Sequence, residues 1–312
     1  MEQRHLGRSG LLVSRLGLGT MTWGQETSPD EAAAQLAGFV DAGGTLVDTA
    51  DVYGDGDSER VLGRLLRDLV PRDDLVVGTK SAIRPNGRYD ASRRHLLTAL
   101  DASLDRLGLE HVDLWQLHVY DPMTPLEETL AALDEAVASG RTRYVGVSNY
   151  AGWQLAKAAA WQRAWPGRAP IVSTQMEYSL LHREIEREVV PAAEDAEVGV
   201  LPWSPLGRGV LTGKYRTGIP ADSRAATTRY AEFVRPYLGE QSRLIVESVS
   251  TAAEGLGVSP LAVALSWVRD RPGVVAPIVG ARTPSQLLGI LQTEDVTLPA
   301  EIRDALDDIS DV

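Results

Sequence analysis

Short apolar runs alternate with longer amphipathic stretches along the whole chain. Eight of these runs have the length and the aliphatic, β-branched composition of buried strands; they cover residues 16–19, 45–48, 75–79, 112–117, 144–147, 171–175, 200–203 and 274–279. The stretches between them place apolar residues on one helical face, as at 29–42, 58–69, 92–107, 125–139, 183–196 and 260–269. This alternation predicts successive strand–helix units around a parallel sheet.

Several of the predicted helices carry residues that favour their start or their end. Ser28, Pro29 and Glu31 supply an N-cap, a first-turn proline and an early carboxylate. Gly43 and Gly44 follow the end of the same predicted run, 29–42, and Gly140 follows the run 125–139. We expect these glycines to stop the two helices.

Eight strands separated by helices are typical of a closed (β/α)8 TIM barrel, which places the chain in the α/β class. No linker rich in proline, glycine or serine divides the chain, so we predict one domain over residues 1–312. Two segments lie outside the repeat. Residues 4–14 have a turn signal from Gly7 to Gly10 and predict an N-terminal β-hairpin, and residues 206–240 predict a long loop after the seventh strand.

Composition limits the possible functions of the 312-residue chain. The formal net charge is −12 at pH 7, and such a surface repels a nucleic-acid backbone. The absence of cysteine excludes thiolate nucleophiles, thiolate-bound metals and a disulfide framework. No stretch approaches the roughly 18 apolar residues that a membrane-spanning helix needs. We therefore expect a cytoplasmic protein with no nucleic-acid partner, no membrane insertion and no metal site.

The long segment after the seventh strand departs from this acidic average. Its cations are Arg208, Lys214, Arg216, Arg224, Arg229 and Arg235, against the acids Asp222, Glu232 and Glu240. We expect this basic segment, together with Arg282, to receive a small phosphate cluster rather than a polymer.

Polar residues stand at the ends of three successive predicted strands, where TIM barrels carry their chemistry. Asp48 ends the second strand and Tyr53 follows it, Lys80 ends the third, and His118 ends the fourth. Each has an ordinary alternative role: a helix cap, a solvated lysine or a buried structural histidine. Their joint occurrence at one end of a barrel favours a catalytic set.

This set is suited to proton transfer from a phenol. An ammonium group such as that of Lys80 beside Tyr53 lowers the pKa of the phenol by favouring its ionised form. Asp48 would keep the buried ammonium paired. His118 could orient a carbonyl oxygen toward the phenol, which would then protonate it.

With these four residues in place, the sequence resembles an aldo-keto reductase, and the resemblance covers nearly the whole chain. The matching stretches cover residues 17–24, 48–54, 58–63, 79–80, 113–118, 140–149, 175–178, 203–206 and 277–282. The resemblance implies a catalytic tetrad of Asp48, Tyr53, Lys80 and His118. The pattern is closer to the branch with bacterial reductases and potassium-channel β subunits than to the aldose reductase branch.

The resemblance also implies NADPH as the cofactor, bound across the barrel mouth without a Rossmann domain. The chain has no G-x-G-x-x-G motif, which agrees with that mode of binding. By the resemblance, Ser148, Asn149 and Gln175 hold the nicotinamide amide and Trp203 lies against its ring. Ser204, Leu206, Gly209 and Lys214 would meet the pyrophosphate, and Gly280, Arg282 and Gln286 the 2′-phosphate. Ile290 stands where the family often has an asparagine near the adenine.

Some assignments leave alternatives open. Ser148 and Asn149 could instead cap the helix that follows them, and Trp203 could be a core residue.

For the substrate pocket we name Trp23, Tyr53, His118 and Val119. We also expect Tyr120 near this pocket, and Tyr230, Phe233 and Tyr237 to fold over the mouth.

The expected reaction is reversible hydride transfer to the carbonyl of an aldehyde or ketone, with Tyr53 as the general acid. One alternative is an NADPH-binding accessory barrel with slow turnover. The other is a lyase that uses Lys80 as a Schiff-base amine.

Overall fold

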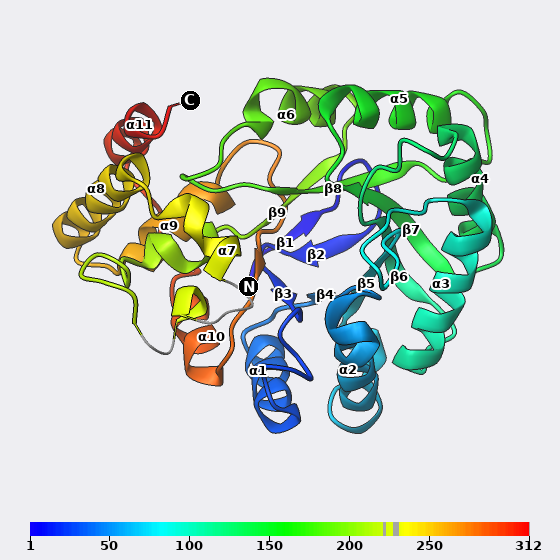
Figure 1. Cartoon of the computed structure of the whole chain (residues 1–312), viewed down its shortest axis with the longest axis horizontal. Helices are drawn as coiled ribbons and strands as arrows, with labels where there is room; N and C mark the ends of the chain where they lie inside the picture. The colour runs from blue at the N-terminus through cyan, green and yellow to red at the C-terminus, as the bar shows by residue number, and fades with distance from the viewer. Residues whose placement is uncertain (221–222, 227–230, 312) are drawn as a thin grey trace.

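Eight parallel strands close into a barrel surrounded by helices (Figure 1). The computed structural model describes residues 1–220, 223–226 and 231–311. The barrel strands are β3 (Gly17–Gly19), β4 (Leu46–Asp48), β5 (Val76–Ser81), β6 (Val112–Leu117), β7 (Thr142–Ser148), β8 (Ile171–Glu177), β9 (Gly199–Trp203) and β10 (Ile278–Val279). Each pairs with the next in the chain, and β10 closes the ring between β9 and β3. The predicted (β/α)8 barrel is confirmed.

Apart from the short helix α7, the α-helices lie outside the barrel (Figure 1). They are α1 (Pro29–Asp41), α2 (Asp57–Asp68), α3 (Arg93–Leu107), α4 (Leu126–Ala138), α5 (Gly152–Arg163), α6 (Ile185–Asp195), α7 (Ala231–Val234), α8 (Glu240–Leu256), α9 (Pro260–Arg269), α10 (Pro284–Leu291) and α11 (Ala300–Ile309). The start of α1 follows its sequence signals. The Ser28 hydroxyl accepts a hydrogen bond from the Glu31 backbone N–H, and the Glu31 carboxylate accepts one from the Ser28 backbone N–H.

The last barrel strand is shorter than the sequence pattern predicts. The apolar run covers residues 274–279, but regular pairing begins only at Ile278, and Val274 makes a single bridge to Val200. Pro277 lies between them and has no N–H to donate to the ladder. An apolar run therefore overestimates the length of a strand when it contains proline.

An antiparallel hairpin of β1 (Gln3–His5) and β2 (Leu12–Ser14) covers the amino-terminal end of the barrel. Its apolar side chains form a small core with residues from the barrel interior; this core includes Leu6, Leu11, Val13, Leu46, Leu114, Val172, Leu201 and Ile278. Gly7 makes the hairpin turn with a φ of 57°, and a Cβ atom there would lie 2.4 Å from the carbonyl oxygen of Val172. Because this end of the barrel is closed, ligands can enter only from the opposite end.

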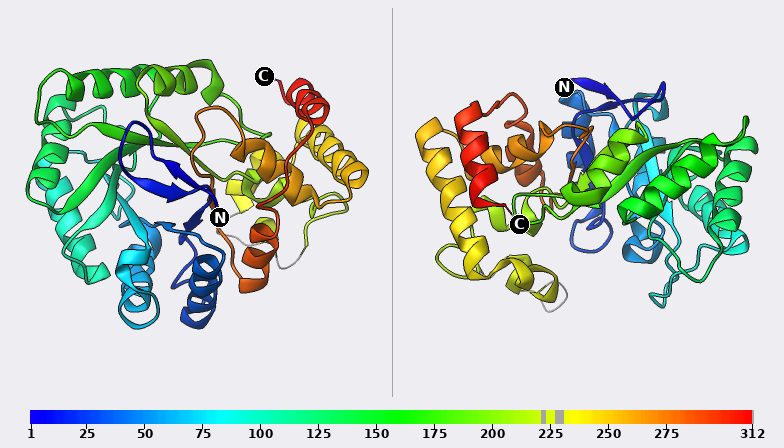
Figure 2. Two further views of the ribbon diagram at one scale, coloured as in Figure 1. Left: turned by 180° about the vertical axis from the view of Figure 1, so that it is seen from behind. Right: turned by 90° about the horizontal axis from the view of Figure 1, so that it is seen from above.

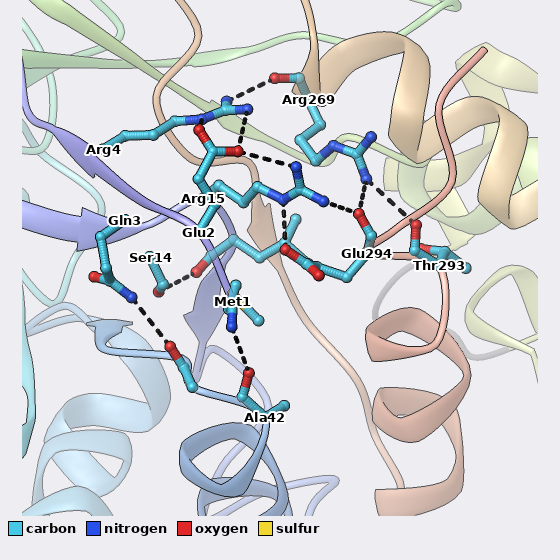
Figure 3. Close-up of polar contacts among 12 residues, drawn as sticks. Met1, Glu2, Gln3, Arg4, Ser14, Arg15, Ala42, Arg269, Thr293 and Glu294 are labelled. Atoms are coloured by element: carbon cyan, nitrogen blue, oxygen red, sulfur yellow. Dashed lines mark hydrogen bonds and ion pairs between the residues drawn. The ribbon is translucent and has the colours of Figure 1, made fainter.

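Charged side chains fasten the hairpin to the rest of the barrel (Figure 3). Glu2 pairs with both Arg4 and Arg15, and Nε of Arg15 lies 2.5 Å from Oε1 of Glu294 near the C-terminus. Arg4 also donates to the carbonyl oxygen of Arg269, at 3.0 Å. The network joins residues that are far apart in the chain and holds the closed end together.

The described residues between β9 and α8 form short helical turns, as expected for the predicted long loop. These turns are Gly207–Thr212, Arg224–Ala226, α7 and Arg235–Tyr237. In the view from above in Figure 2, α7 and the hairpin lie at opposite ends of the molecule. The segment thus belongs to the open end of the barrel.

In the part of the chain that the structure describes, no single helix is long and apolar enough to cross a membrane. Helices α8 and α9 meet that test together by length and composition, with a bend of 102° between them.

Candidate active site at the open end of the barrel

The open end of the barrel brings Asp48, Tyr53, Lys80 and His118 together. Asp48 is the last residue of β4, Lys80 lies one residue before the end of β5, and His118 directly follows β6. Tyr53 starts a helical turn on the loop after β4. Because parallel barrel strands all end at one face, the strand-end positions in the sequence become neighbours in space.

Lys80 is the fully buried centre of this group. Its Nζ atom lies 2.5 Å from Oδ2 of Asp48, 2.9 Å from the carbonyl oxygen of Thr49 and 3.4 Å from the hydroxyl of Tyr53. An ammonium has three N–H donors, and these contacts use all of them. Burial alone would lower the pKa of Lys80, but Asp48 and Tyr53 together outweigh it and raise that pKa. Lys80 therefore stays charged at neutral pH.

Tyr53 is held as a neutral phenol. Burial raises the pKa of its hydroxyl, and Asp48 adds to this shift, while the ammonium of Lys80 opposes it without reversing it. The sequence-based expectation of a lowered pKa is therefore wrong for the net shift, because the pull of Lys80 is smaller than the effect of burial. A protonated phenol at neutral pH is a proton donor.

His118 is held as a neutral ring beside Tyr53. The two ring centroids lie 5.9 Å apart in an edge-on arrangement. Burial, and to a smaller extent the charge of Lys80, lowers the pKa of His118 to about 3. Its Nδ1 atom is buried and makes no hydrogen bond with the described part of the chain. A neutral imidazole here can still donate one N–H to a ligand oxygen.

Asp48 is held on both of its carboxylate oxygens. Oδ2 accepts from Lys80, and Oδ1 accepts from Nε2 of Gln175 at 2.9 Å and from Nε2 of Gln116 at 3.5 Å. Ser173 in turn donates to Oε1 of Gln116. Sequence reasoning missed Gln116 and Ser173, although polar residues within buried strand runs are unusual in a barrel interior and could have marked them.

Ser148 and Asn149 face the site and do not cap the next helix. The N-cap of α5 is Ala151, so the capping alternative is wrong. The Ser148 hydroxyl donates to the carbonyl oxygen of Gln175, and Asn149 Nδ2 donates to that of His118. Asn149 adopts a left-handed backbone conformation, with a φ of 55°, and its Oδ1 accepts from Nε1 of Trp203 at 3.1 Å.

A cavity of about 580 Å³ opens beside the four residues. The predicted site residues in its wall are Asp48, Tyr53, His118, Ser148, Asn149, Gln175, Trp203, Ser204, Leu206, Gly209, Lys214, Gly280, Arg282 and Gln286. Trp203 is thus at the cavity rather than in the core. The wall also contains Phe233, which was expected to fold over the mouth, and Ile290. Met21 and Thr212 line it as well, although the sequence analysis did not assign them to a binding site.

Two residues predicted for the substrate pocket lie outside the cavity wall. Trp23 is fully buried, and its Nε1 donates to Oε1 of Gln35 on α1 at 3.3 Å. We therefore correct that assignment: the indole packs in the core because α1 lies against the loop that carries Trp23. Val119 is partly buried against the main core and does not line the cavity either.

Arg208 is a structural cation rather than a residue held ready for phosphate. It forms two hydrogen bonds with Glu177, of 2.9 and 2.6 Å, and a third with the carbonyl oxygen of Phe233. Its guanidinium lies 3.6 Å from the centroid of the Phe233 ring and 4.9 Å from that of Tyr237. These contacts hold the segment after β9 over the cavity.

The other cations of the predicted basic segment fall into two groups: some pair with carboxylates of the protein, and others line the cavity. Arg216 pairs with Glu247, and Arg235 pairs with Glu232. Lys214 lies in the cavity wall, as does Arg282 from the loop after β10. Of the other predicted residues, Asp222, Arg229 and Tyr230 lie outside the described residues, and the side chain of Arg224 is not described. Fewer cations therefore face the cavity than the number of Lys and Arg residues in the sequence of this segment suggests.

Asp51, on the loop that carries Tyr53, is a titratable group that sequence reasoning missed. Burial, reinforced by the nearby carboxylate of Glu59, raises its pKa to about 7. Its Oδ1 atom is buried and makes no hydrogen bond with the described part of the chain. The carboxylate of Glu59 is itself fully buried and paired with Arg106 at 2.6 Å.

Comparison with known proteins matches nearly the whole chain to a single protein family. The family model described as the aldo/keto reductase family matches residues 15–311. An uncharacterized oxidoreductase of Bacillus subtilis is 36% identical over 99% of this chain and 96% of its own length. A probable voltage-gated potassium channel subunit beta of Oryza sativa is also 36% identical, over 98% and 96%. The L-glyceraldehyde 3-phosphate reductase of Escherichia coli is 35% identical, over 92% and 86%.

Proposed function

The chain belongs to the aldo/keto reductase family and is an oxidoreductase of that family, and on this basis we propose that it reduces the carbonyl group of an aldehyde or ketone with NADPH. The observation that carries the proposal is the contact of the Tyr53 hydroxyl with the buried ammonium of Lys80 at 3.4 Å, at the wall of the cavity. A neutral phenol beside a fixed positive charge can release its proton to a carbonyl oxygen, because the phenolate that remains is stabilised at once.

Each of the four residues has a separate role in this reaction. Tyr53 donates the proton, and Lys80 stabilises the phenolate that forms. Asp48 keeps Lys80 charged and in place through its Oδ2 atom, 2.5 Å from Nζ. The neutral ring of His118 donates a hydrogen bond to the carbonyl oxygen and orients it toward Tyr53. The reverse reaction, oxidation of an alcohol, returns the proton to Tyr53.

The cavity has the features that a nicotinamide dinucleotide needs. Bound NADPH would supply the hydride for the carbonyl carbon, which none of the chain's own side chains can do. Ser148, Asn149 and Gln175 offer hydroxyl and amide groups at the end of the cavity next to Tyr53. Trp203 offers an aromatic face whose ring is fixed by its hydrogen bond to Asn149.

The opposite part of the cavity is suited to phosphate. Gly209 has a φ of 89°, and a Cβ atom there would lie 3.0 Å from Nζ of Lys214, so the glycine leaves room beside this ammonium. Arg282 lies in the wall just before α10, whose first-turn N–H groups favour an anion. Arginine at this position supports a preference for the 2′-phosphate of NADPH over NADH.

Gln286 has a second use that qualifies its predicted role. Its Oε1 atom accepts a hydrogen bond from the backbone N–H of Arg282 at 3.0 Å. We therefore assign Gln286 two roles. It holds the loop that positions Arg282 for the 2′-phosphate, and it can also contact this phosphate directly.

Of the two alternatives, the relatives favour only the accessory barrel. A potassium channel subunit beta is 36% identical to this chain, so slow turnover in a regulatory protein is the second candidate function. The Schiff-base lyase is disfavoured by Lys80 itself, since an amine nucleophile must lose its proton and the contacts of Lys80 raise its pKa.

Titration with NADPH, followed by steady-state turnover, tests the proposal. We expect fluorescence enhancement on binding, a higher affinity for NADPH than for NADH, and turnover of simple aldehydes at roughly 1 s⁻¹ or faster, within the ordinary range for enzymes. Tight binding with turnover at least 100-fold below that rate would support the accessory barrel instead. Absence of binding would refute both candidate functions.

A further inference from the structure

A polar pair lies inside the barrel, one layer deeper than the tetrad. Gln116 on β6 stands two residues before His118, and Ser173 on β8 stands two residues before Gln175. Both are fully buried, and the hydroxyl of Ser173 donates to Oε1 of Gln116 at 3.1 Å. Branched apolar side chains usually fill the interior of a TIM barrel, so a polar pair at this depth is unusual. We call these two residues the Gln116–Ser173 pair.

The strand between them leaves room for this pair. Gly146 on β7 has no side chain, and a Cβ atom there would overlap Oγ of Ser173 and lie 3.2 Å from Cγ of Gln116. The pairing register of β7 and β8 also shifts at this residue. A glycine inside a strand weakens it, because it packs no side chain and loses more backbone entropy on folding. The chain therefore has a weaker strand at the position that lets Gln116 and Ser173 meet.

The Gln116–Ser173 pair is oriented by the carboxylate above it. Nε2 of Gln116 faces Oδ1 of Asp48 at 3.5 Å. Since an ionised carboxylate can only accept hydrogen bonds, the amide must turn its N–H groups toward Asp48 and its oxygen away. That oxygen is buried and needs a donor of its own, which Ser173 supplies. Ser173 thus supports the one orientation of Gln116 that suits Asp48.

Oδ1 of Asp48 has two amide donors in different surroundings. Gln175, at 2.9 Å, lines the cavity at the place proposed for the nicotinamide amide. Gln116 does not line the cavity. A ligand of Gln175 therefore competes with Asp48 for the Gln175 amide, whereas Gln116 is not exposed to that competition.

We propose that Gln116 is a positioning residue for the reaction, which keeps the Asp48 carboxylate turned toward Lys80 while Gln175 engages the cofactor. The inference rests on the proposed reductase function and adds a residue to it. Oδ2 of Asp48 holds Nζ of Lys80 at 2.5 Å, so an Asp48 that rotates would draw the ammonium away from Tyr53. Gln116 acts only through Asp48, and its loss should slow the chemical step rather than weaken binding.

The test uses Gln116→Met, which removes the amide and keeps an unbranched side chain of similar length. Propanal and benzaldehyde serve as substrates of the full chain. We expect the single-turnover rate of NADPH oxidation to fall about tenfold, because a hydrogen bond to a charged group is lost. The Kd for NADPH and the KM for the aldehydes should change less than about twofold.

A pH profile separates positioning from a merely structural role. In the reverse direction, with NADP⁺ and benzyl alcohol, the rate rises as Tyr53 becomes able to accept the proton. With Lys80 held less firmly beside it, the pKa of Tyr53 should rise, and the midpoint of this profile should move up by about half a pH unit or more in Gln116→Met. A general loss of stability would not move this midpoint.

Two further variants complete the comparison. Ser173→Ala leaves the oxygen of Gln116 without its donor and should lower the single-turnover rate in the same direction by a smaller factor; it carries the test if Gln116→Met does not fold. Thr174→Val is the matched control, since it removes the hydroxyl of the next residue on β8. That hydroxyl is buried and makes no hydrogen bond with the described part of the chain, so all rates should stay unchanged.

Four results would overturn the role of Gln116 while the reductase function stands. They are an unchanged single-turnover rate in Gln116→Met, a rise in the Kd for NADPH as large as the fall in rate, an unmoved pH midpoint, and an equal fall in rate in Thr174→Val. If the wild-type protein reduces neither aldehyde, the proposed function fails, and the positioning role fails with it.

Discussion

Nε2 of Gln175 donates a hydrogen bond to Oδ1 of Asp48 at 2.9 Å, while Lys80 binds the other oxygen of the same carboxylate. Gln175 also lines the cavity, at the place proposed for the nicotinamide amide. One side chain therefore lies between the cofactor site and the ion pair that supports Tyr53. This position makes the orientation of Asp48 sensitive to the occupant of the cavity.

Replacing Gln175 should weaken both cofactor binding and proton transfer. In Gln175→Leu we expect the Kd for NADPH to rise up to about tenfold, since a hydrogen bond to the neutral nicotinamide amide contributes about 0.5–1.5 kcal/mol. We expect a parallel fall in kcat, because Asp48 also loses a hydrogen bond. Gln116→Leu is the control, because Gln116 contacts the same Oδ1 atom but does not line the cavity. Equal losses of NADPH affinity in both variants, by fluorescence titration, would contradict a direct role for Gln175.

The ion pair of Asp48 and Lys80 should behave as a mutually dependent unit. Lys80→Met leaves the Asp48 carboxylate buried without its cation, and we expect the free energy of unfolding to fall by about 3–5 kcal/mol. The double variant Lys80→Met/Asp48→Asn should recover much of that loss, because no unpaired charge remains. Urea denaturation of the wild type and of the single and double variants measures this coupling. Additive losses would show that the two groups are independent.

Asp51 should make stability depend on pH near neutrality. Its pKa is raised to about 7 in the folded protein, so the folded state keeps a proton that the unfolded state has already released above about pH 4. Stability therefore falls as pH rises from about 4 to 7. Asp51→Asn mimics the protonated form and should increase the free energy of unfolding at pH 8 by about 3–4 kcal/mol, with little effect at about pH 4, where both states hold the proton. A pH-independent change in urea denaturation would contradict this account.

Glu177 should determine whether the segment after β9 stays ordered. The Glu177–Arg208 pair is mostly buried, with side chains 9% and 12% exposed, and Arg208 in turn holds Phe233. Glu177→Leu removes one partner of a buried pair, and we expect faster hydrogen exchange in residues 231–238, together with a loss of stability of about 3 kcal/mol. Glu232→Leu removes the exposed partner of Arg235 and should change neither. Equal effects of the two variants would refute the role of Glu177.

Sequence patterns predicted the parts of this fold that depend on local periodicity. The barrel strands and the hairpin follow from apolar runs and turn residues, and the start of α1 follows from Ser28, Pro29 and Glu31. The clustering of Asp48, Tyr53, Lys80 and His118 could be foreseen because every parallel strand of a barrel ends at the same face. Their position in the chain thus already determined their position in space.

The features that were missed depend on contacts between distant residues. Arg208 was counted as a free cation because nothing local identifies Glu177, 31 residues earlier, as its partner. Trp23 was placed at the substrate because a loop tryptophan gives no sign that Gln35 on α1 will enclose it. The net pKa shift of Tyr53 depends on the depth of its burial, which only the folded structure provides.

The most direct test of the proposed function is Tyr53→Phe, which removes the hydroxyl and keeps the ring beside His118. NADPH consumption with an aldehyde should fall at least 100-fold, since general acid catalysis contributes about 10²–10⁴, while the fluorescence titration should still show NADPH binding with unchanged affinity. Turnover at a rate near that of the wild type would contradict the assignment of Tyr53 as the acid, and with it the proposed mechanism.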